Sequence, residues 1–245
     1  MSLFAIEYPG YGPAEGEPSE TTVNDNLYTA YQYLLQLGYP PKNIVLMGYS
    51  IGTGPILNLG ASLCAADTPP GAIVTIAAFL SICDIVRDLK GSMLVSWLAG
   101  TIDNRWNSGS IIDRVNCPIL LIHGQQDDVI PYAHSQTLFE RCSSEHKFIR
   151  LCEHATHTHF HEPVDTIEPI SIFLAEMLRP KESITIFPVA AIQFVCPQSV
   201  LQRETTEAAC YPDEGTVISQ QIVDVMLHCC CCVYNRWNVI ICLML

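Results

Sequence analysis

The chain has 245 residues, of which 49% are hydrophobic and only 15% are charged. This composition excludes a disordered protein and is sufficient for one sizeable domain with an appendage. Twelve basic residues against 25 acidic ones give a net charge of −13. Because nucleic acids and anionic lipids are bound by basic surfaces, we expect no nucleic-acid partner and no electrostatic docking to a membrane.

The cysteines and the N-terminus indicate a reducing compartment. Five of the twelve cysteines stand singly between Cys64 and Cys152. No basic N-terminal segment precedes an apolar stretch, so the sequence predicts no secretory signal, a cytoplasmic location and reduced thiols. The long apolar stretches at 184–201 and 222–245 are interrupted by prolines or charged residues, which argues against a transmembrane helix.

Apolar runs alternate with amphipathic segments over the first two thirds of the chain. The runs predict strands at 3–8, 43–47, 72–76, 118–122 and 147–151. Apolar residues at three- and four-residue spacings predict a helix at 23–35, after cap-type residues at 18–22, and further helices follow through Cys64, at 132–141 and at 166–178. Such alternation predicts the α/β class, a mostly parallel sheet with helices on both faces.

The character of the sequence changes near residue 180. Residues 181–245 show no steady hydrophobic period and end in a hydrophobic tip. We therefore predict a catalytic domain over residues 1–180 and a C-terminal tail of uncertain structure over residues 181–245.

The sharpest motif is Gly48-Tyr49-Ser50-Ile51-Gly52, which follows a predicted strand and begins a helix. In this context G-x-S-x-G is a nucleophile elbow: Gly48 and Gly52 let strand and helix approach, and a strained turn exposes the Ser50 hydroxyl. The N–H of Ile51, at the positive end of the helix, is the expected oxyanion donor.

Partners for the serine follow in the order acid, then histidine. The strand at 118–122 leads into a loop with Asp127 and Asp128, either of which could orient a histidine, although both could instead cap the next helix. The loop after residue 151 offers four candidate bases: His154, His157, His159 and His161. Three of these histidines alternate without an acid–cysteine framework, so we expect no metal site.

The chain resembles the α/β-hydrolases, and among them the small intracellular α/β-hydrolase domain proteins that include protein depalmitoylases. The matching segments are EYPGYG at 7–12, GYSIGTG at 48–54, PILLIHGQQD at 118–127 and EHATH at 153–157. The family patterns H-G-x-x-D and E-x-A-x-H imply Asp127 as the acid and His157 as the base.

The beginning of the chain departs from this family. Met1 stands almost at the family's fourth strand, so we expect an N-terminally truncated α/β-hydrolase fold that lacks the first strands. In this family the third strand lies between the fourth and fifth, and the loop after it donates one oxyanion N–H. Without this element, Ile51 is the identifiable donor. A strand from the tail, for which residues 184–195 are the candidate, is the alternative filler of this gap.

We expect a serine hydrolase without a cofactor that cleaves carboxylic ester or thioester bonds through an acyl-enzyme. The substrate would be an acyl ester or thioester, and the resemblance implies an acylated protein and depalmitoylation. The aromatic and aliphatic residues of the segment 77–116 would suit an acyl chain or form ordinary core. Two alternatives remain: a serine peptidase of the prolyl-oligopeptidase-like group, and a non-catalytic truncated hydrolase that acts as an interaction protein.

The C-terminus carries a second type of motif. Cys242-Leu-Met-Leu245 fits the prenylation pattern, and Cys229, Cys230, Cys231 and Cys232 are candidate palmitoylation sites. Two lipid anchors would give membrane association through the tail. The competing interpretation is an ordinary hydrophobic end without lipid.

Overall fold

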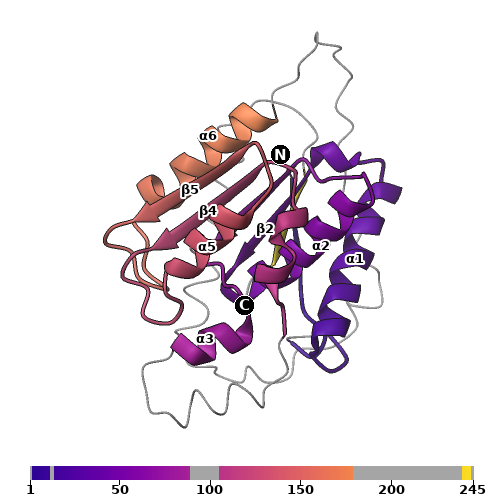
Figure 1. Cartoon of the computed structure of the whole chain (residues 1–245). Coiled ribbons are helices and arrows are strands. Elements are labelled where there is room, and N and C mark those ends of the chain that lie inside the picture. Colours follow the sequence, from indigo (N-terminus) through magenta and orange to yellow (C-terminus); the bar gives the residue numbers. More distant parts are fainter. Residues whose placement is uncertain (1, 12–13, 89–104, 179–238, 244–245) are drawn as a thin grey trace, which may run out of the picture.

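The computed structural model describes residues 2–11, 14–88, 105–178 and 239–243 (Figure 1). The strands in these residues are β1 (Ser2–Ile6), β2 (Ile44–Tyr49), β3 (Ala72–Ile76), β4 (Ile119–Gly124), β5 (Lys147–Cys152) and β6 (Val239–Leu243). The α-helices are α1 (Glu20–Gln36), α2 (Thr53–Ala65), α3 (Ile82–Asp88), α5 (Ala133–Arg141) and α6 (Glu168–Met177). Short 3₁₀ turns occur at Pro41–Asn43, Ser50–Gly52, Ser108–Ser110 and Ile112–Arg114, and one π-helical turn at Pro163–Ile167 precedes α6.

The first five strands and four of the helices are those predicted from sequence periodicity. Each predicted strand agrees with the observed one to within two residues at either end. Helix α1 is capped by Ser19, whose hydroxyl accepts from the Thr22 N–H. The helix buries the side chains expected from the spacing: Val23, Leu27, Tyr31 and Leu34. The α/β class is confirmed, whereas α3 and β6 were not predicted.

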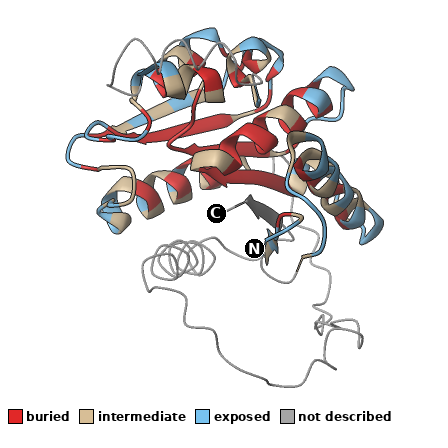
Figure 2. Cartoon of the chain, turned by 90° about the horizontal axis from the view of Figure 1, so that it is seen from below, coloured by how far each residue is buried: buried red, intermediate tan, exposed pale blue. Residues whose placement is uncertain are grey.

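All six strands are parallel and pair in the order β1-β6-β2-β3-β4-β5. Helices α1, α2 and α5 pack on one face of the sheet, through a cluster that includes Leu27, Ile56, Leu57 and Leu138. Helix α6 packs on the other face through Ile170, Phe173 and Leu174. Figure 2 shows both layers with their buried residues turned toward the sheet.

Successive residues of the inner strands alternate between the two faces, as the pleat requires. Leu46 of β2 belongs to the cluster under α1, α2 and α5, whereas its neighbours Val45 and Met47 belong to the cluster under α6. All residues of β2, β3 and β4 are buried. Covered strands of this kind read as continuous apolar runs, which is why the sequence revealed them.

Strand β6 occupies the interior position that we expected to be empty. It pairs in parallel with β1 on one side and with β2 on the other, so that Leu243 lies opposite both Ile6 and Gly48. The tail therefore supplies the strand between β1 and β2, but through Val239–Leu243. Our candidate segment for this position, residues 184–195, lies outside the described residues.

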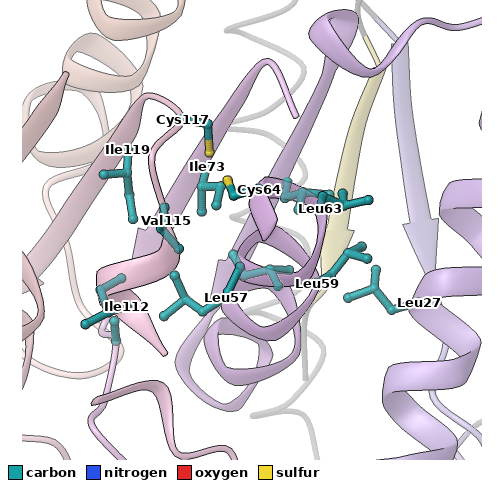
Figure 3. Packing of buried hydrophobic residues seen from close by; sticks show 14 of the residues in the cluster. Leu27, Leu57, Leu59, Leu63, Cys64, Ile73, Ile112, Val115, Cys117 and Ile119 are labelled. Carbon is teal, nitrogen blue, oxygen red and sulfur yellow. The ribbon is translucent and has the colours of Figure 1, made fainter. Parts of the chain in front are cut away.

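The five cysteines between Cys64 and Cys152 are free thiols, and all are buried. Cys64 and Cys117 lie among the aliphatic side chains of the larger core cluster (Figure 3). Here they pack as small hydrophobic residues. Within the described ranges, no helix is long and apolar enough to cross a membrane.

Candidate active site

Three predicted site residues lie just beyond the carboxyl ends of three strands of the parallel sheet. Ser50 follows β2, Asp127 lies in the loop after β4, and His157 lies in the loop after β5. Because the strands are parallel, these loops emerge at the same edge of the sheet. Open α/β sheets form their binding sites at this edge.

Ser50 sits on a tight turn between β2 and α2. Its φ of 51° is in the left-handed region, which costs a residue with a side chain about 1–3 kcal/mol. A Cβ atom at Gly48 would lie 2.5 Å from the Gly52 carbonyl oxygen, so only glycine allows this approach. The buried Thr53 hydroxyl donates to the Ser50 carbonyl over 2.7 Å and holds the turn from the helix side.

The Ser50 hydroxyl, the His157 ring and the Asp127 carboxylate form one hydrogen-bonded chain. Ser50 Oγ is 3.0 Å from His157 Nε2, and His157 Nδ1 is 2.8 Å from Asp127 Oδ2. Since a carboxylate only accepts, Nδ1 carries the proton and Nε2 is left to accept from the serine. The ring is thus in the tautomer that can remove a proton from Ser50.

The Asp127 carboxylate is buried and held on both oxygens. Oδ1 accepts from the backbone N–H groups of Val129 and Ile130 over 2.9 and 2.7 Å. Burial alone would raise the pKa of this carboxyl, but hydrogen bonds from His123, His157 and the Ile130 N–H outweigh it and hold the pKa below its usual range. Asp127 is therefore ionised at neutral pH. Asp128, the alternative acid, is exposed to solvent.

The loop that carries His157 approaches the end of β4 closely. A Cβ atom at Gly124 would lie 2.3 Å from the Ala155 carbonyl oxygen. The Gln126 N–H also donates to this oxygen, over 3.0 Å, and joins the acid loop to the histidine loop. The other three candidate bases, His154, His159 and His161, are exposed.

Tyr49 is a site residue that sequence reasoning did not identify. Its hydroxyl donates to the His157 backbone carbonyl, and its ring centroid lies 5.6 Å from that of the imidazole. Burial, and to a lesser degree the negative charge of Asp127, raise the pKa of Tyr49, so its hydroxyl stays a donor. Its place next to Ser50 in the elbow was the available signal, but the partner of that hydroxyl is distant in sequence.

The structure describes the expected oxyanion donor, the candidate lipid sites and the segment 77–116 only in part. Ile51 lies in the 3₁₀ turn that leads into α2. Of the candidate lipid sites, the cysteines at 229–232 lie outside the described residues, and the backbone of Cys242 pairs with Ala5 and Met47 inside the sheet. Lipidation stays a prediction. In the segment 77–116, Phe79 is fully buried and Trp106 packs against Gly54, while residues 89–104 are not described.

Comparisons with known proteins agree with this architecture. A family model described as serine aminopeptidase, S33, matches residues 87–164. The chain is 30% identical over 149 residues to lysophosphatidylserine lipase ABHD12 of Danio rerio, covering 56% of this chain and 38% of that protein. It is 31% identical over 143 residues to human alpha/beta hydrolase domain-containing protein 17C, covering 58% and 40%. The chain thus spans about two fifths of the length of these relatives.

A solved structure gives the same fold. The monoacylglycerol lipase of Paleococcus ferrophilus aligns with a TM-score of 0.50 and 17% identity, covering 70% of this chain and 81% of that one. The parallel sheet, the serine-bearing turn after β2 and the related proteins lead to one conclusion. The chain has the α/β-hydrolase fold and is similar in sequence to α/β-hydrolase domain proteins.

Proposed function

We propose that this protein is a serine hydrolase that cleaves carboxylic ester or thioester bonds through an acyl-enzyme. The observation that carries the proposal is the chain of hydrogen bonds from Ser50 through His157 to Asp127. Each bond is of ordinary hydrogen-bond length, and the order serine, acid, histidine along the sequence is that of the α/β-hydrolases.

The geometry supports a two-stage acyl transfer. As Ser50 Oγ attacks the acyl carbonyl, His157 Nε2 takes its proton and then gives it to the departing alcohol or thiol. Asp127, ionised and fixed by its hydrogen bonds, stabilises the positively charged ring. In the second stage water gives a proton to His157, attacks the acyl-enzyme and releases the acid, and the proton returns to Ser50.

Stabilisation of the tetrahedral intermediate falls to backbone N–H groups near the start of α2. The N–H of Ile51 follows the nucleophile at the positive end of this helix. Loss of one such donor costs about 10²–10³ in kcat, so a second donor matters to the rate. The carboxyl end of β6 reaches the same edge, because Leu243 lies opposite Gly48, two residues before Ser50.

The names of the relatives support an acyl substrate. Lysophosphatidylserine lipase and monoacylglycerol lipase are names of proteins that act on acyl lipids, which favours an acyl ester or thioester for this chain. Similarity to the 17C protein agrees with the sequence resemblance to small α/β-hydrolase domain proteins. Because that resemblance implies depalmitoylation, an acylated protein is the partner we propose to test first.

A serine peptidase is the second candidate, because the family model that matches residues 87–164 is described as a serine aminopeptidase. Both enzymes would use the same three residues. They differ in the leaving group, which is an amine for the peptidase and an alcohol or thiol for the esterase.

Labelling with a fluorophosphonate probe tests the proposal. We expect the wild-type chain and Ser62→Ala, an exposed serine on α2, to be labelled and Ser50→Ala to remain unlabelled. Matched palmitoyl thioester, oxygen ester and peptide-amide substrates would then be compared. Faster turnover of the amide would favour the peptidase, and a folded protein that no probe labels would support the non-catalytic interaction protein.

A further inference from the structure

A second histidine, His123, contacts Asp127 in addition to His157. His123 is near the carboxyl end of β4, and its side chain is completely buried. The acyl-transfer steps above do not use it. A buried titratable ring next to a carboxylate of the site calls for a physical explanation.

The contacts of His123 indicate which of its ring nitrogens carries a hydrogen. Nε2 lies 2.9 Å from the Ile130 carbonyl oxygen and 3.3 Å from Asp127 Oδ2. Both are acceptors, so Nε2 carries a proton and shares it between them. In the neutral ring Nδ1 then accepts from the hydroxyl of Ser135, which is also fully buried and lies 2.6 Å away.

Asp127 is consequently the centre of a nearly symmetrical chain. The outer arm runs through His157 to Ser50, and the inner arm runs through His123 to Ser135. The inner arm has no contact with solvent, so it cannot meet a substrate. It can act only through the position and charge of the carboxylate.

We propose that His123, held in place by Ser135, is a positioning residue that fixes the rotation and the charge of Asp127 for its contact with His157. The inference rests on the proposed function. The two backbone N–H donors hold only Oδ1, whereas His123 is a second donor to Oδ2, the oxygen that accepts the hydrogen bond from His157 Nδ1. By bonding the Ile130 carbonyl as well, His123 closes the acid loop around the carboxylate.

The chain offers a matched control for the loss of a buried histidine. His134 is also buried, accepts from the Leu80 N–H over 3.1 Å and contacts Asp88 over 2.8 Å. Its replacement by leucine removes two comparable hydrogen bonds away from Asp127. A change in reactivity seen in His123→Leu and not in His134→Leu is therefore not a general effect of destabilisation.

The experiment compares the wild type with His123→Leu, His123→Gln and His134→Leu. The readouts are the fluorophosphonate labelling rate, the melting temperature and the low-field proton resonance of the His157 Nδ1–H. We expect His123→Leu to be labelled about 10- to 100-fold more slowly than His134→Leu at a similar melting temperature, because misplaced catalytic groups lose rates of this order. His123→Gln keeps a donor at the Nε2 position and should recover most of the rate. Equal rates for the two leucine variants would overturn the proposal.

Two less disruptive variants, Ser135→Ala and its control Ser144→Ala, test the proposal if His123→Leu does not fold. Ser135→Ala removes the hydroxyl that orients His123, and Ser144→Ala removes another buried serine hydroxyl, which accepts from the His146 N–H over 3.2 Å. We expect slower labelling in Ser135→Ala alone. Labelling of both at the wild-type rate would contradict the role of the inner arm.

Failure of the proposed function has a separate signature. If the wild-type chain is not labelled, Ser50 is not an activated nucleophile, and the resonance alone decides the positioning role. A low-field proton present in the wild type and His134→Leu but absent from His123→Leu supports that role. A resonance that persists in His123→Leu, or that the wild type itself lacks, overturns it.

Discussion

Strand β6 is the feature whose disruption gives the most direct test of the fold. Ile241 lies at its centre, with its backbone opposite Phe4 of β1 and Leu46 of β2. Proline has no N–H and does not fit the middle of a sheet. We therefore expect Ile241→Pro to break the ladder on one side and to force β6 away from its neighbours.

The magnitude follows from the pairing. One ladder hydrogen bond is lost, a carbonyl of the neighbouring strand loses its donor, and the ring clashes with adjacent backbone. Together these effects cost about 3 kcal/mol. In a protein of this size each kcal/mol lowers the melting temperature by about 2–4 °C, which predicts a fall of about 6–12 °C.

Differential scanning fluorimetry of the full chain measures this change, with Ile241→Val as the control because valine keeps the strand preference. Release of β6 would also expose the edges of β1 and β2, so we expect Ile241→Pro to aggregate more readily. A melting temperature for Ile241→Pro within 2 °C of that of Ile241→Val, about the effect of 1 kcal/mol or less, would refute the placement of β6 inside the sheet.

Three further changes address the site. In Gly124→Ala the new Cβ would lie 2.3 Å from a backbone oxygen of the loop that carries His157. This loop must shift, so labelling by fluorophosphonate should slow by about tenfold or more. Labelling of Gly124→Ala at the wild-type rate would show that the shift does not disturb His157. Tyr49→Phe removes the donor to the His157 carbonyl and should lower the free energy of unfolding by about 1 kcal/mol in urea titrations. The control is Tyr31→Phe, which should not lower the free energy of unfolding by this amount, because the buried Tyr31 hydroxyl has no hydrogen-bond partner within the described residues. Equal losses in the two variants would contradict a stabilising role of the hydrogen bond from Tyr49 to His157. The pKa of Asp127 is lowered in the folded state, so the ionised carboxylate stabilises the folded protein fully above the unfolded pKa of about 4, and this stabilisation is lost as the pH falls further. In Asp127→Asn the melting temperature should therefore depend less on pH below about pH 4 than in the wild type. Parallel curves of melting temperature against pH for the two proteins would contradict this.

The residues near Ser50 show what local sequence can predict. The G-x-S-x-G motif lay between a buried apolar run and a helical pattern, and the structure has β2, a tight turn and α2 at these places. Gly48 is required by a contact with Gly52, only four residues away. The residues that form this turn are adjacent in the sequence, so the turn could be predicted without knowledge of the rest of the chain.

The partners of His157 could not be found in the same way. Spacing alone left Asp127 and Asp128 open as acids and four histidines open as bases, and only a family pattern chose among them. The contacts of Tyr49 with His157, and of Ser135 with His123, carried no local signal, because they depend on how β2, β4, β5 and α5 come together.

The amino-acid sequence by itself determined the α/β class, the positions of β1 to β5 and the elbow at Ser50, because hydrophobic period and turn chemistry act over short stretches of chain. Only the tertiary structure decided that Val239–Leu243 lies between β1 and β2 and that Asp127 is held from both sides. A short apolar segment can pair with any open strand edge of suitable register. Its partner is therefore chosen by the completed sheet and not by the segment.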